Sequence, residues 1–110
     1  MNVIGNVKGK TCIITDDIID SGGTIVNAAD ALIKRGAKEV YVYVTHGVLS
    51  GEAVEKIKKS KIKNLVVTDT IDNSDKVKKS RNIEVLSISN LLAEAMRRIS
   101  NSTSVSDLFK

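Results

Sequence analysis

The chain has 110 residues, enough for one domain with a single modest core. Hydrophobic residues make up 42% and charged residues 27%, as in ordinary globular proteins, and the net charge is +4. The lysines are interspersed with apolar residues, which is typical of solvated helix faces and does not indicate nucleic-acid binding. No stretch approaches the ~18 apolar residues of a membrane span, and no signal-like region is present. We therefore expect a cytoplasmic chain that binds neither nucleic acid nor membrane.

Strand-like and helix-like patterns alternate along the chain. Residues 11–15 form a continuous apolar run, typical of a strand buried on both faces, and contain Cys12, expected to be a small buried hydrophobe. From Thr24 the apolar residues recur at helical spacing, and Gly36 stands where a C-cap is expected. Further strands are expected at 40–44, 65–68 and 83–88, and further helices at 51–59 and after Ser89, a candidate N-cap. The alternation predicts an α/β fold: a parallel sheet flanked by helices and covered on both sides.

The stretch IITDDIIDSGGTI, residues 13–25, places Asp16 and Asp17 at the expected end of the first strand. Ligands of open parallel sheets bind beyond the carboxyl ends of the strands. The following turn leads into a helix, whose free N–H groups and dipole favour an anion, and its glycines allow close approach. The turn therefore predicts a phosphate-binding cradle, formed by Ser21, Gly22, Gly23 and Thr24.

A carboxylate beside a phosphate repels it, so the acids are expected to face another part of the ligand. Vicinal ribose hydroxyls fit an ionised aspartate, and Mg²⁺ bridging sugar and carboxylate would also fit. The structural alternative is a tight turn in which Asp20 or Ser21 merely caps the helix. His46 and Asp69 also end strands, where His46 is expected to shape a loop and Asp69 either lines the crevice or stabilises a turn.

The same stretch resembles the ribose-phosphate-binding signature of the phosphoribosyltransferase fold. Its doubled acids are similar to those of ribose-phosphate pyrophosphokinases, which transfer a diphosphoryl group from ATP to ribose 5-phosphate. The segments LVVTDTI, LLAEAMRRI and SVSDLF extend the resemblance over nearly the whole chain. It implies that residues 1–110 are the C-terminal, phosphoribosyltransferase-like domain of such an enzyme, truncated on the N-terminal side.

Carried over by position, the resemblance assigns Asp16 to the ribose and leaves the role of its neighbour Asp17 open. It assigns the 5-phosphate to Asp20, Ser21, Gly22, Gly23 and Thr24. Near the C-terminus, a regulatory phosphate or ADP site between subunits is implied at Ser104, Ser106 and Phe109. Glu52 and Asp72-Asn73 stand where the family often has proline, which predicts two looser loops. Ser102-Thr103 replace a frequent Glu, which weakens the expectation of a working regulatory site.

The implied activity is diphosphoryl transfer in nucleotide biosynthesis, with ribose 5-phosphate and phosphoribosyl pyrophosphate as ligands. The resemblance implies that ATP, most ligands of Mg²⁺ and the basic catalytic residues belong to an upstream part. No catalytic residue is therefore assigned here, and the chain is expected to be inactive alone. We also expect a homo-oligomer, or association with full-length enzyme. The alternatives are a non-catalytic regulatory subunit of the synthetase, a phosphoacceptor receiver domain, or a phosphoribosyltransferase acting on a base.

Overall fold

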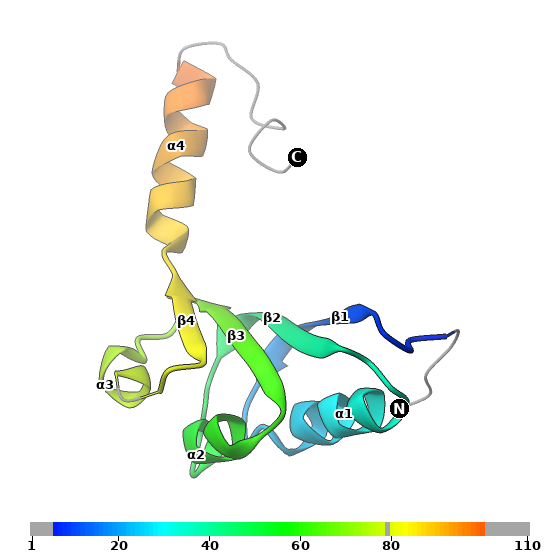
Figure 1. Cartoon of the computed structure of the whole chain (residues 1–110). Helices are drawn as coiled ribbons and strands as arrows, with labels where there is room; N and C mark the ends of the chain where they lie inside the picture. The colour runs from blue at the N-terminus through cyan, green and yellow to red at the C-terminus, as the bar shows by residue number, and fades with distance from the viewer. Residues whose placement is uncertain (1–5, 79, 101–110) are drawn as a thin grey trace.

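The computed structural model describes residues 6–78 and 80–100, which form an α/β fold, as predicted (Figure 1). A four-stranded, wholly parallel sheet has the order β1-β2-β3-β4. The strands are β1 (Thr11–Ile19), β2 (Glu39–Gly47), β3 (Ile62–Thr68) and β4 (Ile83–Leu86). The helices are α1 (Gly23–Lys34), α2 (Ala53–Lys59), α3 (Ser74–Val77) and α4 (Ile88–Ser100).

Helices α1 and α2 lie on the same face of the sheet (Figure 1). The strand order follows the chain order without reversal, so every crossover advances the sheet in one direction. Because crossovers between parallel strands are right-handed, successive helices then fall on one face. The core lies between this face and the two helices, and its most buried members include Val40, Val42, Ala53, Ile57 and Leu65.

The prediction of a sheet covered on both sides is wrong for the described residues. Along β2, Val42 and Val44 are buried, whereas Tyr43, pointing to the opposite face, is 43% exposed. The predicted double burial of β1 also fails, since Ile13 is 58% exposed. Cys12 is only partly buried, although it packs against the core. A continuous apolar run does not by itself show how many faces are covered.

The ends of several elements differ from the predictions. β1 continues to Ile19, four residues beyond Thr15, and the short helix α3 was not predicted. At the end of α1, Gly36 has a φ of 94°, and the N–H of Ala37 donates to the carbonyl of Leu32. That is the expected glycine-terminated helix end.

Helix α4 follows β4 directly and projects away from the sheet (Figure 1). Its apolar residues share one face, as predicted, but Leu92, Met96 and Ile99 are all exposed. The predicted N-cap Ser89 lies inside the helix, and the Ser87 hydroxyl instead accepts the N–H of Asn90. Within residues 6–78 and 80–100, no helix is long and apolar enough to cross a membrane.

Candidate functional site

The turn between β1 and α1 leaves the N-terminal end of the helix open. Gly22 adopts the left-handed conformation, with φ 84° and ψ −6°, and α1 begins at Gly23. No side chain of the described residues caps this end, so the alternative in which Asp20 or Ser21 caps the helix does not hold. The first N–H groups of a helix lack intrahelical partners and carry roughly half a positive charge together. This end of α1 therefore offers free donors to an anion.

A hollow of about 250 Å³ lies at this turn. It brings together most of the predicted site residues, and its lining includes Asp16, Asp20, Ser21, Gly22 and Thr24. Gly23 is not among the lining residues of the hollow, and a Cβ built on it would meet nothing within 4 Å outside its chain neighbours and its own helix backbone. We call this hollow and the turn at residues 20–24 the cradle. Within the described part of the chain its lining contains no lysine or arginine, so main-chain groups and hydroxyls are its donors.

The paired acids lie inside β1 rather than beyond its end, which corrects the predicted position. Asp16 is aligned with Val44 of β2, and the strand continues for three residues after it. Both aspartates are exposed, and the N–H of Asp17 donates to Asp16 Oδ1 at 2.7 Å. Asp16 lines the cradle, whereas Asp17 does not.

A second, larger hollow of about 710 Å³ lies on the uncovered face of the sheet. Asp17 lines it, and Asp16 reaches it as well. Tyr43, Thr45, Thr68 and Leu86 are among its other lining residues. Asp16 is therefore the one acid of the pair that borders both hollows.

Asp20 has a partner that the sequence did not suggest. The Ser50 hydroxyl donates to Asp20 Oδ1, and the Ser50 N–H donates to the Asp20 carbonyl at 3.0 Å. Ser50 lies in the loop between β2 and α2, thirty residues away in sequence. Only the fold brings these two residues together.

Other polar side chains, at the strand ends and in the loop after β3, hold loops in place through hydrogen bonds. His46 Nδ1 lies 2.8 Å from Thr70 Oγ1, in agreement with its expected loop-shaping role. Asp69 accepts the N–H of Ile88 at 2.8 Å and so stabilises the start of α4. Asn73 is buried and donates to the carbonyls of Gly47 and Ile71. This side chain ties the loop down where a looser segment was expected in the absence of proline.

Metal and regulatory sites were also expected. Among the described residues, no three His, Cys, Asp or Glu side chains gather as a metal cluster. These residues therefore do not form a protein cage for Mg²⁺; a divalent ion could use one or two aspartates only together with ligand oxygens. The predicted regulatory residues Ser104, Ser106 and Phe109 lie outside the described residues.

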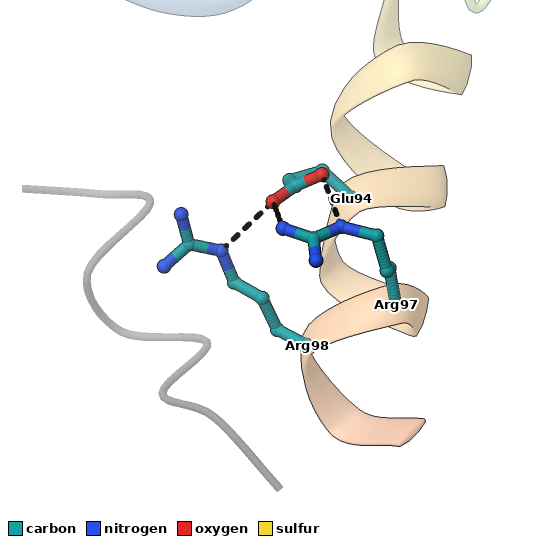
Figure 2. Close-up of polar contacts among 3 residues, drawn as sticks. All are labelled: Glu94, Arg97 and Arg98. Atoms are coloured by element: carbon teal, nitrogen blue, oxygen red, sulfur yellow. Dashed lines mark hydrogen bonds and ion pairs between the residues drawn. The ribbon is translucent and has the colours of Figure 1, made fainter. Parts of the chain in front are cut away.

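An ion-pair network lies on α4, away from the cradle. Figure 2 shows Arg97 and Arg98 directed at one carboxylate, that of Glu94. Arg97 Nε donates to Glu94 Oε2 at 3.0 Å, and Arg98 Nε donates to Oε1 at 3.1 Å. Hydrogen bonds from Arg97 and then Arg98 lower the pKa of Glu94 to about 2. The network stabilises α4 locally rather than forming part of a ligand site.

Comparison with known proteins relates this chain to one class of enzymes. The sequence model of the family "Phosphoribosyl synthetase-associated domain" matches residues 1–110. Ribose-phosphate pyrophosphokinases of Bradyrhizobium diazoefficiens and Hyphomonas neptunium are 59% and 61% identical over 109 residues. Each match covers 99% of this chain but only 34% and 35% of the relative.

A solved structure gives the same relationship. The crystal structure of phosphoribosylpyrophosphate synthetase from Mycobacterium smegmatis superposes with a TM-score of 0.78 at 42% identity. The match covers 90% of this chain and 33% of that one, so this chain spans about a third of the length of its relatives. Since the family model matches all 110 residues, the chain belongs to the phosphoribosyl synthetase-associated domain family.

Proposed function

We propose that this chain is the ribose 5-phosphate-binding portion of a ribose-phosphate pyrophosphokinase. The observation that carries the proposal is the uncapped N-terminal end of α1, which opens into a hollow also lined by Asp16. A 5-phosphate accepts hydrogen bonds from the free N–H groups and from the hydroxyls of Ser21 and Thr24. Gly23, which presents no side chain there, lets the phosphate approach the backbone closely.

The sugar then extends from the cradle toward the paired acids. Asp16 borders both hollows, which supports the proposal that its carboxylate accepts hydrogen bonds from the vicinal hydroxyls of the ribose. Phosphoribosyl pyrophosphate carries the same 5-phosphate and hydroxyls and is proposed as the second ligand. Mg²⁺ is proposed as an ion that arrives with the ligands and takes most of its oxygen ligands from them.

Diphosphoryl transfer from ATP is proposed for the complete enzyme and not for this chain alone. Catalysis of phosphoryl transfer depends on groups that neutralise the charge that develops on the phosphates. Neither hollow is lined by a lysine or arginine within the described part of the chain. We expect no phosphoribosyl pyrophosphate synthesis by the purified chain with ATP and Mg²⁺, and robust synthesis would contradict this expectation.

Calorimetric titration with a set of related ligands tests the proposed binding. Ribose 5-phosphate should bind saturably, while ribose, which lacks the phosphate, should bind at least about tenfold more weakly. 2-Deoxyribose 5-phosphate should fall between them, because it keeps the phosphate but loses one hydroxyl for Asp16. Equal affinity for ribose and ribose 5-phosphate would show that the cradle does not bind the phosphate.

A non-catalytic regulatory subunit is a second candidate, favoured by the uncovered apolar surface. The open face of the sheet exposes Ile13, Tyr43 and Leu86, and α4 exposes a further apolar stripe. Exposed apolar surface of this kind is typical of association sites, and the proposed partner is a full-length synthetase. Co-purification with such an enzyme, together with altered nucleotide inhibition, would support this candidate. A lack of any effect on the full-length enzyme would exclude it.

A further inference from the structure

We propose that Ser50 is a positioning residue for the cradle and that it acts through the carboxylate of Asp20. The inference rests on the proposed function, since it treats the cradle as the phosphate site. Ser50 forms two hydrogen bonds to the same residue, one from its hydroxyl to Asp20 Oδ1 and one from its N–H to the Asp20 carbonyl. The loop after β2 is thereby joined to the first residue of the phosphate-binding turn.

The orientation of the Asp20 carboxylate matters because this group lines the hollow that would receive the phosphate. Two anions in one small hollow repel each other unless a donor holds and partly neutralises one of them. The Ser50 hydroxyl is such a donor, and a hydrogen bond to an ionised carboxylate is stronger than one between neutral groups. Its loss would free the Asp20 side chain to turn toward the ligand.

Ser50 is itself held in place by the residues before it. The N–H groups of Val48 and Leu49 both donate to the Ile19 carbonyl, at 2.9 and 3.2 Å. Leu49 is buried and has a φ of 52°, a conformation that is costly for a residue with a branched side chain. Such backbone strain persists only where the surroundings fix the segment, and it concentrates at functional sites.

Lys76 fixes the same loop from the other side. Its ammonium group donates to the carbonyls of Val48 and Leu49, at 3.3 and 3.4 Å. The contacts therefore run from α3 through the strained loop to Ser50 and then to Asp20. Through these contacts, the loop after β2 sets the geometry of the turn between β1 and α1, although none of its residues belongs to that turn.

Amide hydrogen exchange of the free chain, measured by NMR, tests the positioning without any ligand. In Ser50→Ala the amides at positions 26 and 50, which donate to the carbonyls of Gly22 and Asp20, should exchange several-fold faster, because the turn loses one of its two attachments to the loop. Ser89→Ala is the matched control, since Ser89 is an exposed serine in α4, away from the cradle. Unchanged exchange at positions 26 and 50 in Ser50→Ala would overturn the proposal.

Titration with ribose 5-phosphate tests the functional consequence. Ser50→Ala should weaken binding about tenfold, the loss typical of one hydrogen bond, and Ser50→Thr, which keeps the hydroxyl, should restore it. Asp20→Asn in the Ser50→Ala background should recover part of the affinity, because it removes the freed negative charge. Wild-type affinity in Ser50→Ala would overturn the proposal. Failure of the wild-type chain to bind would refute the proposed function instead, and the exchange experiment would still decide the role of Ser50.

Discussion

Asp16 and Asp17 are adjacent in β1, yet only Asp16 lines the cradle, while both border the hollow on the open face of the sheet. Successive residues of a strand point to opposite faces, which agrees with only one of the two acids lining the cradle. Asp16 and Asp17 therefore have different surroundings, and we expect them to have different roles. The proposed sugar contact falls on Asp16, and Asp17 remains available to a larger ligand on the open face.

Removing each charge separately tests this division. Asp16→Asn should weaken ribose 5-phosphate binding about tenfold, because an amide is a poorer acceptor for two hydroxyls than a carboxylate. Asp17→Asn is the matched control and should leave the affinity within about twofold. Both affinities are measured by calorimetric titration. A larger loss in Asp17→Asn than in Asp16→Asn would assign the sugar to the open face.

Gly23→Ala separates binding from folding. A Cβ at residue 23 meets no atom within 4 Å, so the free chain should accommodate it. Alanine is favoured over glycine in a helix by about 0.5–1 kcal/mol, so the thermal midpoint should stay constant or rise. If the phosphate approaches the backbone at Gly23 as proposed, the same methyl group obstructs it, and the affinity for ribose 5-phosphate should fall at least about tenfold.

Asn27→Ala, an exposed change one turn further along α1, is the control for this experiment and should bind normally. Calorimetry gives the affinity and circular dichroism the thermal midpoint. Unaltered affinity in a folded Gly23→Ala chain would mean that no anion approaches this end of the helix.

The regular spacing of apolar residues predicted helix α1 and its buried face correctly. Ile25, Ala29 and Leu32 are buried on one face of α1, and Gly36 ends the helix as expected. The covering of the sheet could not be predicted in the same way, because Ile13 and Ile14 are equally apolar although only Ile13 is widely exposed. Strand order decides which face is covered, and a list of strands does not reveal that order.

The candidate site shows the same limit. The glycine turn and the acids were recognisable because they are contiguous in sequence. The Ser50–Asp20 contact joins segments thirty residues apart, and Ser50 carries no local pattern that marks it. The end of β1 was also misplaced, since charged residues such as Asp16 suggested a strand end although they continue an edge strand.

Asn73→Ala tests whether the loop after β3 depends on this one buried side chain. The change leaves the carbonyl of Gly47 without its Asn73 donor, in a region too close-packed for easy relaxation, with Val67 against Gly47. We expect a net loss of about 0.5–1.5 kcal/mol in the free energy of unfolding, because the change also removes Asn73 Oδ1, which is buried without a hydrogen-bond partner among the described residues. Urea denaturation measures it, with Asn27→Ala as the exposed control. Equal stability of the two variants would show that the Asn73 hydrogen bonds are dispensable.

Helix α4 should lose helicity in acid because the carboxylate of Glu94 becomes protonated. Hydrogen bonds from Arg97 and Arg98 lower the pKa of Glu94 from its ordinary 4.5 to about 2. A depressed folded-state pKa means that the stabilisation is complete above about pH 4.5 and is lost as the pH falls through about 2. The signal is the Glu94 carboxyl resonance followed by NMR together with the α4 amide shifts.

Two variants control this titration. Glu94→Gln should remove the acid-dependent change in α4, whereas Glu84→Gln, at an exposed position in β4, should leave it intact. An unshifted Glu94 midpoint would show that the two arginines do not hold the carboxylate in solution. High salt should raise the midpoint, because the network is exposed and therefore screened.

The uncovered apolar surface predicts self-association of the isolated chain. Leu86 is 56% exposed on the open side of the sheet, and Met96 is 63% exposed on α4. β1 also lies at a sheet edge, and unpaired edges favour further association. Sedimentation velocity should therefore show concentration-dependent oligomers. Leu86→Lys should shift them toward monomer, because a charge within the contact is costly to bury, while Asn27→Lys, on the solvated side of α1, should not. A wild-type chain that stays monomeric at high concentration would show that this apolar surface does not cause association. The proposal of a regulatory subunit would then lose its main support.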